Sequence, residues 1–254
     1  MSGRTIVVGD IHGCYDELLD LLSLIQFRQS DQIIAVGDLI TKGPANRAVL
    51  DRFITDSRFA SVIGNHDLAL LRHWKGEDVK LSRAQKTAVK ELESAKQKYH
   101  AYLAGLPFWI DRQTYLVVHA GIRPGIPLAT QSPDDLTTLR TLGPKPTSGR
   151  GVPWYRTYDG TQKILFGHWP ARRPRLGINA VGLDTGCVYG HRLTAFAIDT
   201  AEFVSVPARA AYARKRMFSS QQKTAPTKPE AHMKFATRED QSPPIIASTE
   251  SIQP

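Results

Sequence analysis

Three short apolar runs recur in the first quarter of the chain, and each is followed by a glycine and polar residues. The runs are Thr5–Val8, Gln32–Val36 and Phe59–Ile63, and the segments after them read GDIHG, GDLITKGP and GNHD. β-Rich runs bounded in this way are typical of strands. Between the first two runs, and again after the second in ANRAVLDRFI, apolar residues recur at helical spacing. This part of the chain is therefore predicted to have a β-α-β pattern.

A second group of apolar runs lies after residue 110, and some of them are close enough in sequence to pair as antiparallel strands. A polar surface helix is predicted over Leu81–Tyr102. A short helix is predicted over Pro133–Leu142, after Ser132, with loop from there to Gly160. Together these elements predict an α/β fold with two mixed sheets flanked by helices. The later predicted strands are Tyr115–Val118, Lys163–Phe166, Ile178–Leu183, Leu193–Asp199 and Glu202–Val206.

Length and composition fit a folded domain rather than a fibrous or wholly disordered chain. The 254 residues are 41% hydrophobic and 22% charged, enough to bury a sizeable core. No apolar run approaches the ~20 residues that span a bilayer, and the amino terminus lacks a signal-peptide core, so a cytoplasmic protein without membrane contact is expected. The two cysteines, Cys14 and Cys187, are too few for a disulfide scaffold or a thiolate metal cage, and we expect both to be small core residues.

The formal charge of +9 favours anionic partners such as phosphorylated small molecules or nucleotides. Ala208–Pro254 has eight cations and four anions, so it carries +4 of that excess. This segment is rich in Pro, Ser, Gln and Thr and has no apolar period. We therefore predict a catalytic domain over residues 1–207 and a basic, largely disordered tail over residues 208–254. The tail is expected to be a solvated segment, with weak RNA or other nucleic-acid contact as the alternative.

The polar residues after the predicted strands have the chemistry of metal ligands. Ligands bind beyond the carboxyl ends of strands in open α/β sheets, so the three glycine-bounded loops should converge on one site. Carboxylates, an amide and imidazoles could hold two divalent cations ~3.5 to 4 Å apart, which would clamp the oxygens of a phosphoryl group during in-line displacement. The six candidate ligands are Asp10, His12, Asp38, Asn65, His119 and His168.

The motifs GDIHG, GDLITKGP, GNHD, HAGI and FGHW resemble the phosphoprotein-phosphatase branch of the metallophosphoesterases. Within it, GDIHGCYDEL, GNHDLALL and LDTGCVYG are similar to the symmetrical diadenosine tetraphosphatases and ApaH-like phosphatases. The resemblance implies a four-layer αββα metallophosphoesterase sandwich. It implies one metal held by Asp10, His12 and Asp38, a second held by Asp38, Asn65, His119 and His168, and His66 as the general acid. Mn²⁺ is the expected ion, and the same donors suit Fe²⁺, Co²⁺ and Zn²⁺.

Substrate-binding cations are predicted from the same resemblance. Lys42 stands where protein phosphatases of this branch have arginine, and its point charge can neutralise a phosphate oxygen without the fork geometry of a guanidinium. Arg140 matches a phosphate-binding arginine of the relatives, and Arg150 is a second candidate. Arg172, Arg173 and Arg175 could extend this cluster, and Asp184 could orient a ligand histidine or cap a turn.

These observations predict a two-metal hydrolase that cleaves phosphoanhydride bonds of dinucleoside polyphosphates, diadenosine tetraphosphate to two ADP above all, or of similar nucleotide-capped or polyphosphate substrates. Only about 45 residues separate HAGI from FGHW, where the tetraphosphatases have a longer insertion, so a more open site is expected. The enzymatic alternative is a serine/threonine or broad protein phosphatase. The non-enzymatic alternative is a nucleotide- or RNA-binding protein with a relic site.

Overall fold

A computed structural model describes residues 3–214 of the chain. Residues 215–254, which include most of the predicted basic tail, lie outside the described residues, so the disorder of the tail stays a prediction. Residues 208–214 contact the first helix, because Arg209 pairs with Asp16 and Asp20 and the Tyr212 hydroxyl donates to Glu17. No helix among the described residues is long and apolar enough to cross a membrane.

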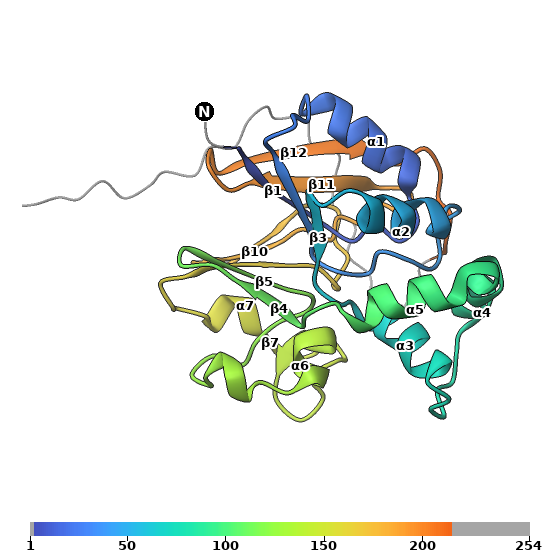
Figure 1. Ribbon diagram of the computed structural model, residues 1–254. Helices are drawn as coiled ribbons and strands as arrows, with labels where there is room; N and C mark the ends of the chain where they lie inside the picture. The colour runs from blue at the N-terminus through green and yellow to red at the C-terminus, as the bar shows by residue number, and fades with distance from the viewer. Residues whose placement is uncertain (1–2, 215–254) are drawn as a thin grey trace, which may run out of the picture.

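Two five-stranded mixed sheets form the centre of the molecule (Figure 1). The first has the order β12-β11-β1-β2-β3, with β1 (Thr5–Val8), β2 (Gln32–Ala35) and β3 (Phe59–Ser61) parallel, and β11 (Arg192–Ala197) and β12 (Glu202–Pro207) antiparallel. The second has the order β4-β5-β8-β10-β9. Its elements are β4 (Trp109–Asp111), β5 (Tyr115–Val118), β8 (Lys163–Phe166), β9 (Arg175–Leu176) and β10 (Ala180–Gly182).

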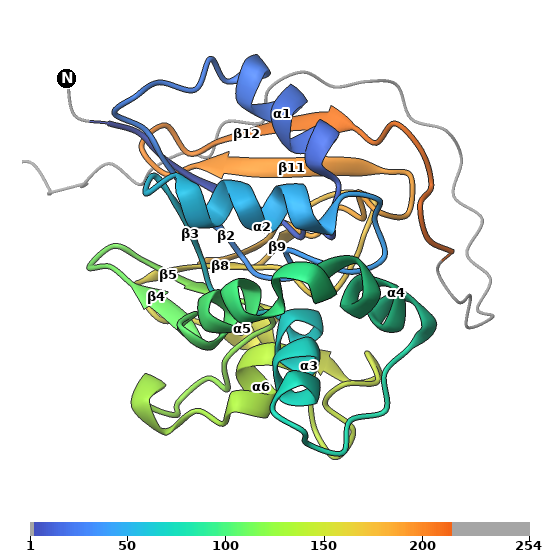
Figure 2. The ribbon, with the colours of Figure 1, turned by 45° about the vertical axis from the view of Figure 1, so that its right-hand side comes forward.

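Helices cover the outer face of each sheet, which completes four layers. On the first sheet lie α1 (Tyr15–Leu24) and α2 (Asn46–Thr55), with α1 over β11 and β12 (Figure 2). Beside them lie α3 (Asn65–Trp74), α4 (Arg83–Leu92), η1 (Glu93–Ala95) and α5 (Lys96–Ala104). On the second sheet lie α6 (Pro133–Thr138) and α7 (Trp154–Thr157), with η2 (Leu128–Thr130) and the small β6 (Thr141–Leu142) and β7 (Val152–Pro153) ribbon. The predicted α/β class with two mixed sheets is confirmed.

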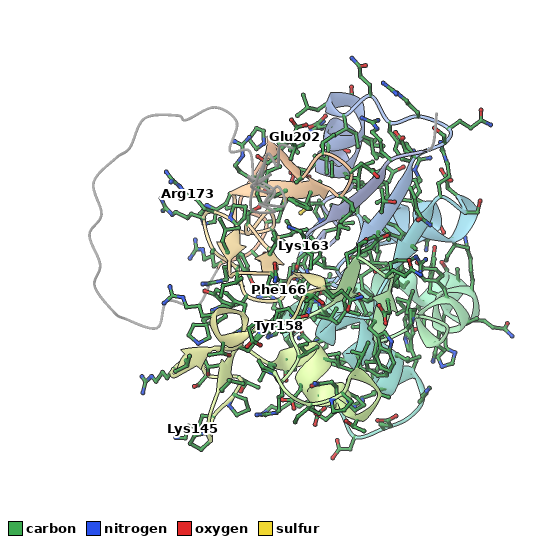
Figure 3. The ribbon with its side chains drawn as sticks, turned by 90° about the vertical axis from the view of Figure 1, so that its left-hand side faces the viewer. Lys145, Tyr158, Lys163, Phe166, Arg173 and Glu202 are labelled. Carbon is green, nitrogen blue, oxygen red and sulfur yellow. The ribbon has the colours of Figure 1, made fainter. Side chains whose placement is uncertain are left out.

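Strand periodicity explains the three hydrophobic clusters that hold these layers together. Successive strand residues point to opposite faces of a sheet. In β1, Ile6 and Val8 face the helices of the first layer, whereas Val7 faces the other sheet. In the second sheet, Phe166 packs beneath α7, where Tyr158 lies in the same cluster (Figure 3). Burial on both faces fixes the register of the strands and therefore the place where each strand ends.

Two predicted elements differ from the observed ones. The single helix predicted over Leu81–Tyr102 is wrong, because α4 ends at Leu92 and α5 begins at Lys96. The three residues between them form the 3-10 turn η1, and Ala95 leaves the helical backbone with a φ of −132°. The stretch predicted as loop up to Gly160 contains β7 and α7, which is anchored by the buried Trp154 ring. The helix predicted over Pro133–Leu142 ends at Thr138, before β6.

Candidate metal centre

The carboxyl ends of five parallel strands bring the six predicted ligands to one edge of the molecule. Asp10 and His12 follow β1, Asp38 follows β2 and Asn65 follows β3, and these strands are neighbours in the first sheet. His119 and His168 follow β5 and β8, which are neighbours in the second sheet. Because the two sheets pack face to face, both sets of loops meet at the same edge. Their role as ligands stays a prediction.

Asp38 lies in the middle of this cluster, with its two oxygens facing different histidines. Its Oδ2 lies 3.4 Å from His12 Nε2, and its Oδ1 lies 3.5 Å from His119 Nε2. The backbone N–H of His66 donates to Oδ1 at 2.9 Å. A carboxylate in this position can serve two cations at once, which is the geometry that a bridging ligand needs.

Asn65 joins the two histidines of the second sheet. Its Oδ1 lies 3.0 Å from His119 Nε2 and 2.9 Å from His168 Nδ1. An amide oxygen has lone pairs and no proton, so it can bind a hard or borderline cation. The three side chains therefore present neutral oxygen and nitrogen donors to a common point.

Asp10 is held against the loop that carries His168. Both of its carboxylate oxygens lie 3.1 Å from the His168 backbone nitrogen, which donates to them. Gly167 makes this approach possible, because a Cβ there would lie 2.0 Å from Asp10 Oδ1. Gly64 has the same role on the other side, where a Cβ would lie 2.2 Å from Asp38 Oδ1. The glycines of FGHW and GNHD thus leave room for carboxylates.

The backbone around the cluster is left-handed at several residues with side chains. His12, Asp38 and His168 have φ values of 50°, 51° and 65°. Such conformations cost ~1–3 kcal/mol each for residues other than glycine and are concentrated at functional sites. Here the strained turns point the three side chains inward at the strand ends, which extended backbone would not do.

Hydrogen bonds to backbone carbonyls set the orientation of two imidazoles. His12 Nδ1 lies 3.1 Å from the Ile40 carbonyl and His119 Nδ1 lies 2.8 Å from the Val36 carbonyl. Each Nδ1–H therefore donates outward, which leaves the Nε2 lone pair facing Asp38. Burial lowers the pKa of His12 well below its usual range and that of His119 to about 4. Both rings are thus neutral, which is the form that binds metal.

The carboxylates show why cations fit here. Burial, followed by the charges of Asp184 and Asp38, raises the pKa of Asp10 well above its usual range, and burial raises the pKa of Asp38 to about 6. Several buried anions close together are stable only when positive charge compensates them. Divalent cations between the neutral imidazoles and these carboxylates would supply it, so the donor set fits the predicted metals.

His66 lies within the cluster, and a ligand atom of its ring lies within 4.8 Å of ligand atoms of both His12 and Asp38. Its ring meets the His12 ring edge to face, with 5.1 Å between the centroids. Its Nδ1 is buried and has no hydrogen-bond partner among the described residues. The neighbouring Asp67 points away from it and accepts the backbone N–H groups of Gly64, Leu39 and Ile40. Asp67 therefore ties the Asp38 loop to the start of α3.

A cavity of about 300 Å³ opens onto the cluster and contains two of the predicted substrate-binding cations. Lys42 Nζ lies 2.8 Å from His12 Nε2 and 5.6 Å from the centre of the Tyr189 ring. Arg140 lines the same cavity, and its buried Nε has no hydrogen-bond partner in the described part of the chain. The lining residues are His12, Asp38, Lys42, Asn65, His66, Arg140, His168, Trp169, Pro170, Asp184 and Tyr189.

The other predicted cations lie outside this cavity. Arg150 is exposed on the loop between β6 and β7, a loop that also carries Lys145 (Figure 3). Arg172 and Arg173 are exposed, whereas the Arg175 guanidinium stacks on the Trp169 ring at 4.1 Å. Arg175 can therefore act on the cavity only through Trp169.

Three lining residues carry information that the motifs did not. Trp169 and Tyr189 were not predicted as site residues, although each belongs to a motif that was used: Trp169 ends FGHW, and Tyr189 lies within LDTGCVYG. Asp184 accepts the Gly186 N–H at 3.0 Å, which is the turn-capping role considered from the sequence, and it also lines the cavity. The site thus combines two cations with two aromatic rings.

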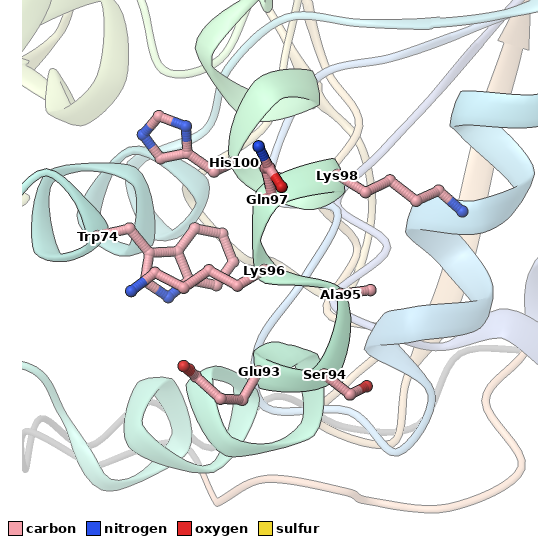
Figure 4. A pocket seen from close by; sticks show the side chains of 8 residues that line it. All are labelled: Trp74, Glu93, Ser94, Ala95, Lys96, Gln97, Lys98 and His100. Atoms are coloured by element: carbon pink, nitrogen blue, oxygen red, sulfur yellow. The ribbon is translucent and has the colours of Figure 1, made fainter.

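A second hollow lies between the end of α3 and the segment of η1 and α5, and it differs in chemistry. The residues that line it are Trp74, Glu93, Ser94, Ala95, Lys96, Gln97, Lys98 and His100 (Figure 4). It is wide and open to solvent. None of the groups of histidines and carboxylates that could hold an ion lies there, within residues 3–214. It therefore carries no site of the kind found at the strand ends.

Comparisons with known sequences agree with this geometry. The profile of the calcineurin-like phosphoesterases matches residues 3–220. The asymmetrical bis(5′-nucleosyl)-tetraphosphatase PrpE of Halalkalibacterium halodurans is 30% identical over 229 residues, covering 80% of this chain and 93% of that protein. PrpE of Bacillus subtilis, which bears the same name, is 29% identical over 237 residues, covering 83% and 97%.

Solved structures of phosphatases have a fold similar to that of this chain. A crystal structure of a protein proposed to be a diadenosine tetraphosphatase has a TM-score of 0.72 and 34% identity, covering 82% of this chain and 95% of that one. A cold-active protein-tyrosine phosphatase from a Shewanella species has a TM-score of 0.55 at 16% identity, covering 82% and 81%. The second likeness is one of fold alone.

Proposed function

The chain belongs to the calcineurin-like phosphoesterase family of hydrolases, and we propose that it cleaves a phosphoanhydride bond of dinucleoside tetraphosphates with two divalent metal ions. The observation that supports this substrate is the similarity to bis(5′-nucleosyl)-tetraphosphatases. The similarity extends over nearly the whole length of these relatives. The family predicted from the motifs is thereby confirmed. The substrate and the number of metal ions are our proposal.

In this proposal, Asp10, His12 and Asp38 hold one ion, and Asp38, Asn65, His119 and His168 hold the other. When bound, such ions supply positive charge to the phosphoryl oxygens and lower the pKa of water. Their charge also compensates the buried carboxylates described above. Mn²⁺ is the expected ion from the donor set, with Fe²⁺, Co²⁺ and Zn²⁺ as alternatives.

The cavity residues of this chain then bind the polyphosphate. Lys42 and Arg140 both reach the cavity, so they can neutralise oxygens of phosphates on either side of the scissile bond. Lys42 now donates to His12 Nε2, and occupation of that lone pair by a cation would release its ammonium group toward the substrate. Trp169 and Tyr189 provide apolar ring surface beside these charges, which suits a nucleoside.

His66 is proposed to hold the proton that the leaving oxygen receives. It lines the cavity, and its Nδ1 has no other hydrogen-bond partner among the described residues. Burial, and after it the charge of Lys42, lowers its pKa well below the usual range. A polyphosphate beside it would act in the opposite direction, because a nearby anion favours the imidazolium. Proton donation is thus coupled to substrate binding.

The products distinguish two routes. The motifs predicted the symmetrical reaction to two ADP, whereas the relatives are named for the asymmetrical reaction, which supports ATP and AMP. Purified enzyme with Mn²⁺ should convert diadenosine tetraphosphate into one of these pairs, resolved by ion-exchange chromatography. Faster release of phosphate from phosphopeptides than cleavage of the anhydride, at equal enzyme and metal, would contradict the proposed substrate. It would support the protein-phosphatase alternative, which stays a prediction.

A further inference from the structure

Three buried side chains meet at the start of α1, outside the residues that line the catalytic cavity. They are Cys14, which precedes the helix, Glu17 in its first turn, and Cys187 in the loop after β10. One ligand atom of each lies within 4.8 Å of the other two. Each residue is no more than 2% exposed. The sequence predicted both cysteines to be core residues of no chemical role, because it could not show that they meet beside a carboxylate.

Glu17 is the feature that ordinary core packing does not explain. Its Oε1 accepts the Arg209 backbone N–H and the Tyr212 hydroxyl, each at 2.8 Å. Its Oε2 is buried and has no hydrogen-bond partner among the described residues. The Arg209 guanidinium turns away and pairs with Asp16 and Asp20. Buried carboxylates are retained where they are paired or where they coordinate a metal.

The chemistry of the three groups suits a thiophilic cation. Zn²⁺ binds cysteine sulfur at ~2.3 Å and carboxylate oxygen at ~2.0–2.2 Å in tetrahedral geometry, so ligand atoms of one ion are ~3.5–4 Å apart. The ligand atoms of Cys14, Glu17 and Cys187 lie within 4.8 Å of one another, which exceeds that spacing by about 1 Å at most. The amino-terminal end of α1 also favours negative charge, which two thiolates and a carboxylate would bring.

We propose that Cys14, Glu17 and Cys187 form a second, structural metal site for a thiophilic divalent ion such as Zn²⁺. Binding forms two metal–sulfur bonds and one metal–oxygen bond and releases the two thiol protons to solvent, with no change of oxidation state. Cys14 comes two residues after His12, and Cys187 comes three residues after Asp184. The ion would therefore tie together two loops of the catalytic cavity that are distant in sequence.

Cobalt titration of the full-length protein tests this site. The protein is stripped with chelator, kept in a reductant without thiols, and titrated with Co²⁺ while the thiolate-to-cobalt charge-transfer absorption is recorded. Because the chain has two cysteines in all, this absorption reports on Cys14 and Cys187 and not on the catalytic cluster. Wild type and Asp38→Asn should both show the band, because Co²⁺ that enters the catalytic cluster adds nothing to the thiolate absorption.

Two variants separate a metal site from a packing cluster. Cys187→Ser should abolish the band or reduce it strongly. Glu17→Gln keeps an acceptor for Arg209 and Tyr212 but loses the anionic ligand, so its affinity for Co²⁺ should fall by ~10-fold or more. Zn²⁺ should raise the unfolding temperature of wild type by more than it raises that of Cys187→Ser, which keeps only the catalytic cluster.

Absence of the band in folded wild type at excess Co²⁺ overturns the proposal, and this result needs no variant to fold. An unchanged band in Cys187→Ser overturns it as well. If wild type and Glu17→Gln bind Co²⁺ with equal affinity, the Glu17 carboxylate is not a ligand. The lack of a hydrogen-bond partner at Glu17 Oε2 is then not explained by metal binding. None of these outcomes depends on the identity of the catalytic substrate.

Discussion

Gly64→Ala is a small change that tests how tightly the geometry of Asp38 controls the site. A Cβ at residue 64 would lie 2.1 Å from the Asp38 nitrogen and 2.2 Å from its Oδ1, whereas real Cβ contacts essentially never fall under 3.0 Å. Asp38 must therefore retreat by ~1 Å. A misplacement of that size costs ~10²-fold in rate when it moves a group that positions the reactants. We expect kcat/KM to fall by at least that factor and bound metal to fall with it.

The measurement compares kcat/KM on diadenosine tetraphosphate, bound metal by elemental analysis, and urea unfolding. The matched control is Gly105→Ala at the end of α5, where a Cβ would meet its nearest atoms at 3.5 and 3.6 Å and should change none of these quantities. If Gly64→Ala keeps its metal and retains activity within a factor of two, Asp38 is not the central ligand. Loss of stability alone, with normal activity in the folded fraction, would equally refute a central role for Asp38.

Four further predictions follow from the site and its supports. His66→Asn should leave bound metal intact and slow turnover by ~10²-fold; equal slowing of a substrate with a very acidic leaving group would rule out proton donation. Lys42→Arg should raise the ratio of kcat/KM for phosphopeptide over diadenosine tetraphosphate at fixed salt, because the fork of arginine suits a monoester dianion; an unchanged ratio would show that this residue does not select substrate class. The Arg4 guanidinium beside Asp31 lowers the pKa of that carboxyl to about 2, below its unfolded value, so this stabilisation is present above pH ~4 and disappears as the pH falls toward ~2. Urea unfolding should therefore show wild type ~1–2 kcal/mol more stable than Asp31→Asn at pH 7, with the gap closing in acid; a gap that does not depend on pH would contradict the ion pair. A chain that ends near Ser219 should keep the kcat of the full chain, since every proposed ligand precedes it; a large loss of kcat would assign the tail a catalytic role.

The fold followed from the sequence where hydrophobic periodicity was strong. β1, β5 and β8 have the predicted bounds, because each is a short apolar run buried on both faces. The break between α4 and α5 could not be predicted, because residues 83–104 contain no proline or glycine to mark it. Likewise, α7 is held in place by the burial of Trp154 against the second sheet, and no local sequence pattern predicts this contact.

The part of the candidate site that lies at the strand ends could be predicted, because the strands themselves could be predicted. Asp10, Asp38 and Asn65 follow adjacent parallel strands, so the chain order alone brought them together. Lys42 reaches the cavity, but Arg150 does not, because loops without periodicity give no indication of direction. Trp169 and Tyr189 were missed because an isolated aromatic residue is far more often part of a core. Cys14 and Cys187 meet only through the packing of α1 against the far end of the chain.

The position of β1 between β2 and β11 has a consequence for the order in which the molecule forms. During synthesis, the first strand emerges almost 190 residues before the strand that completes its hydrogen bonds. Asp10 likewise waits for the amide of His168, 158 residues later in the chain. Contacts of such long range form slowly, because the entropy of closing the loop is lost before the contact is gained. A nascent chain that has exposed only β1, β2 and β3 therefore has an open sheet edge and an incomplete cluster. Hydrolytic competence arrives only when the carboxyl-terminal strands have left the ribosome.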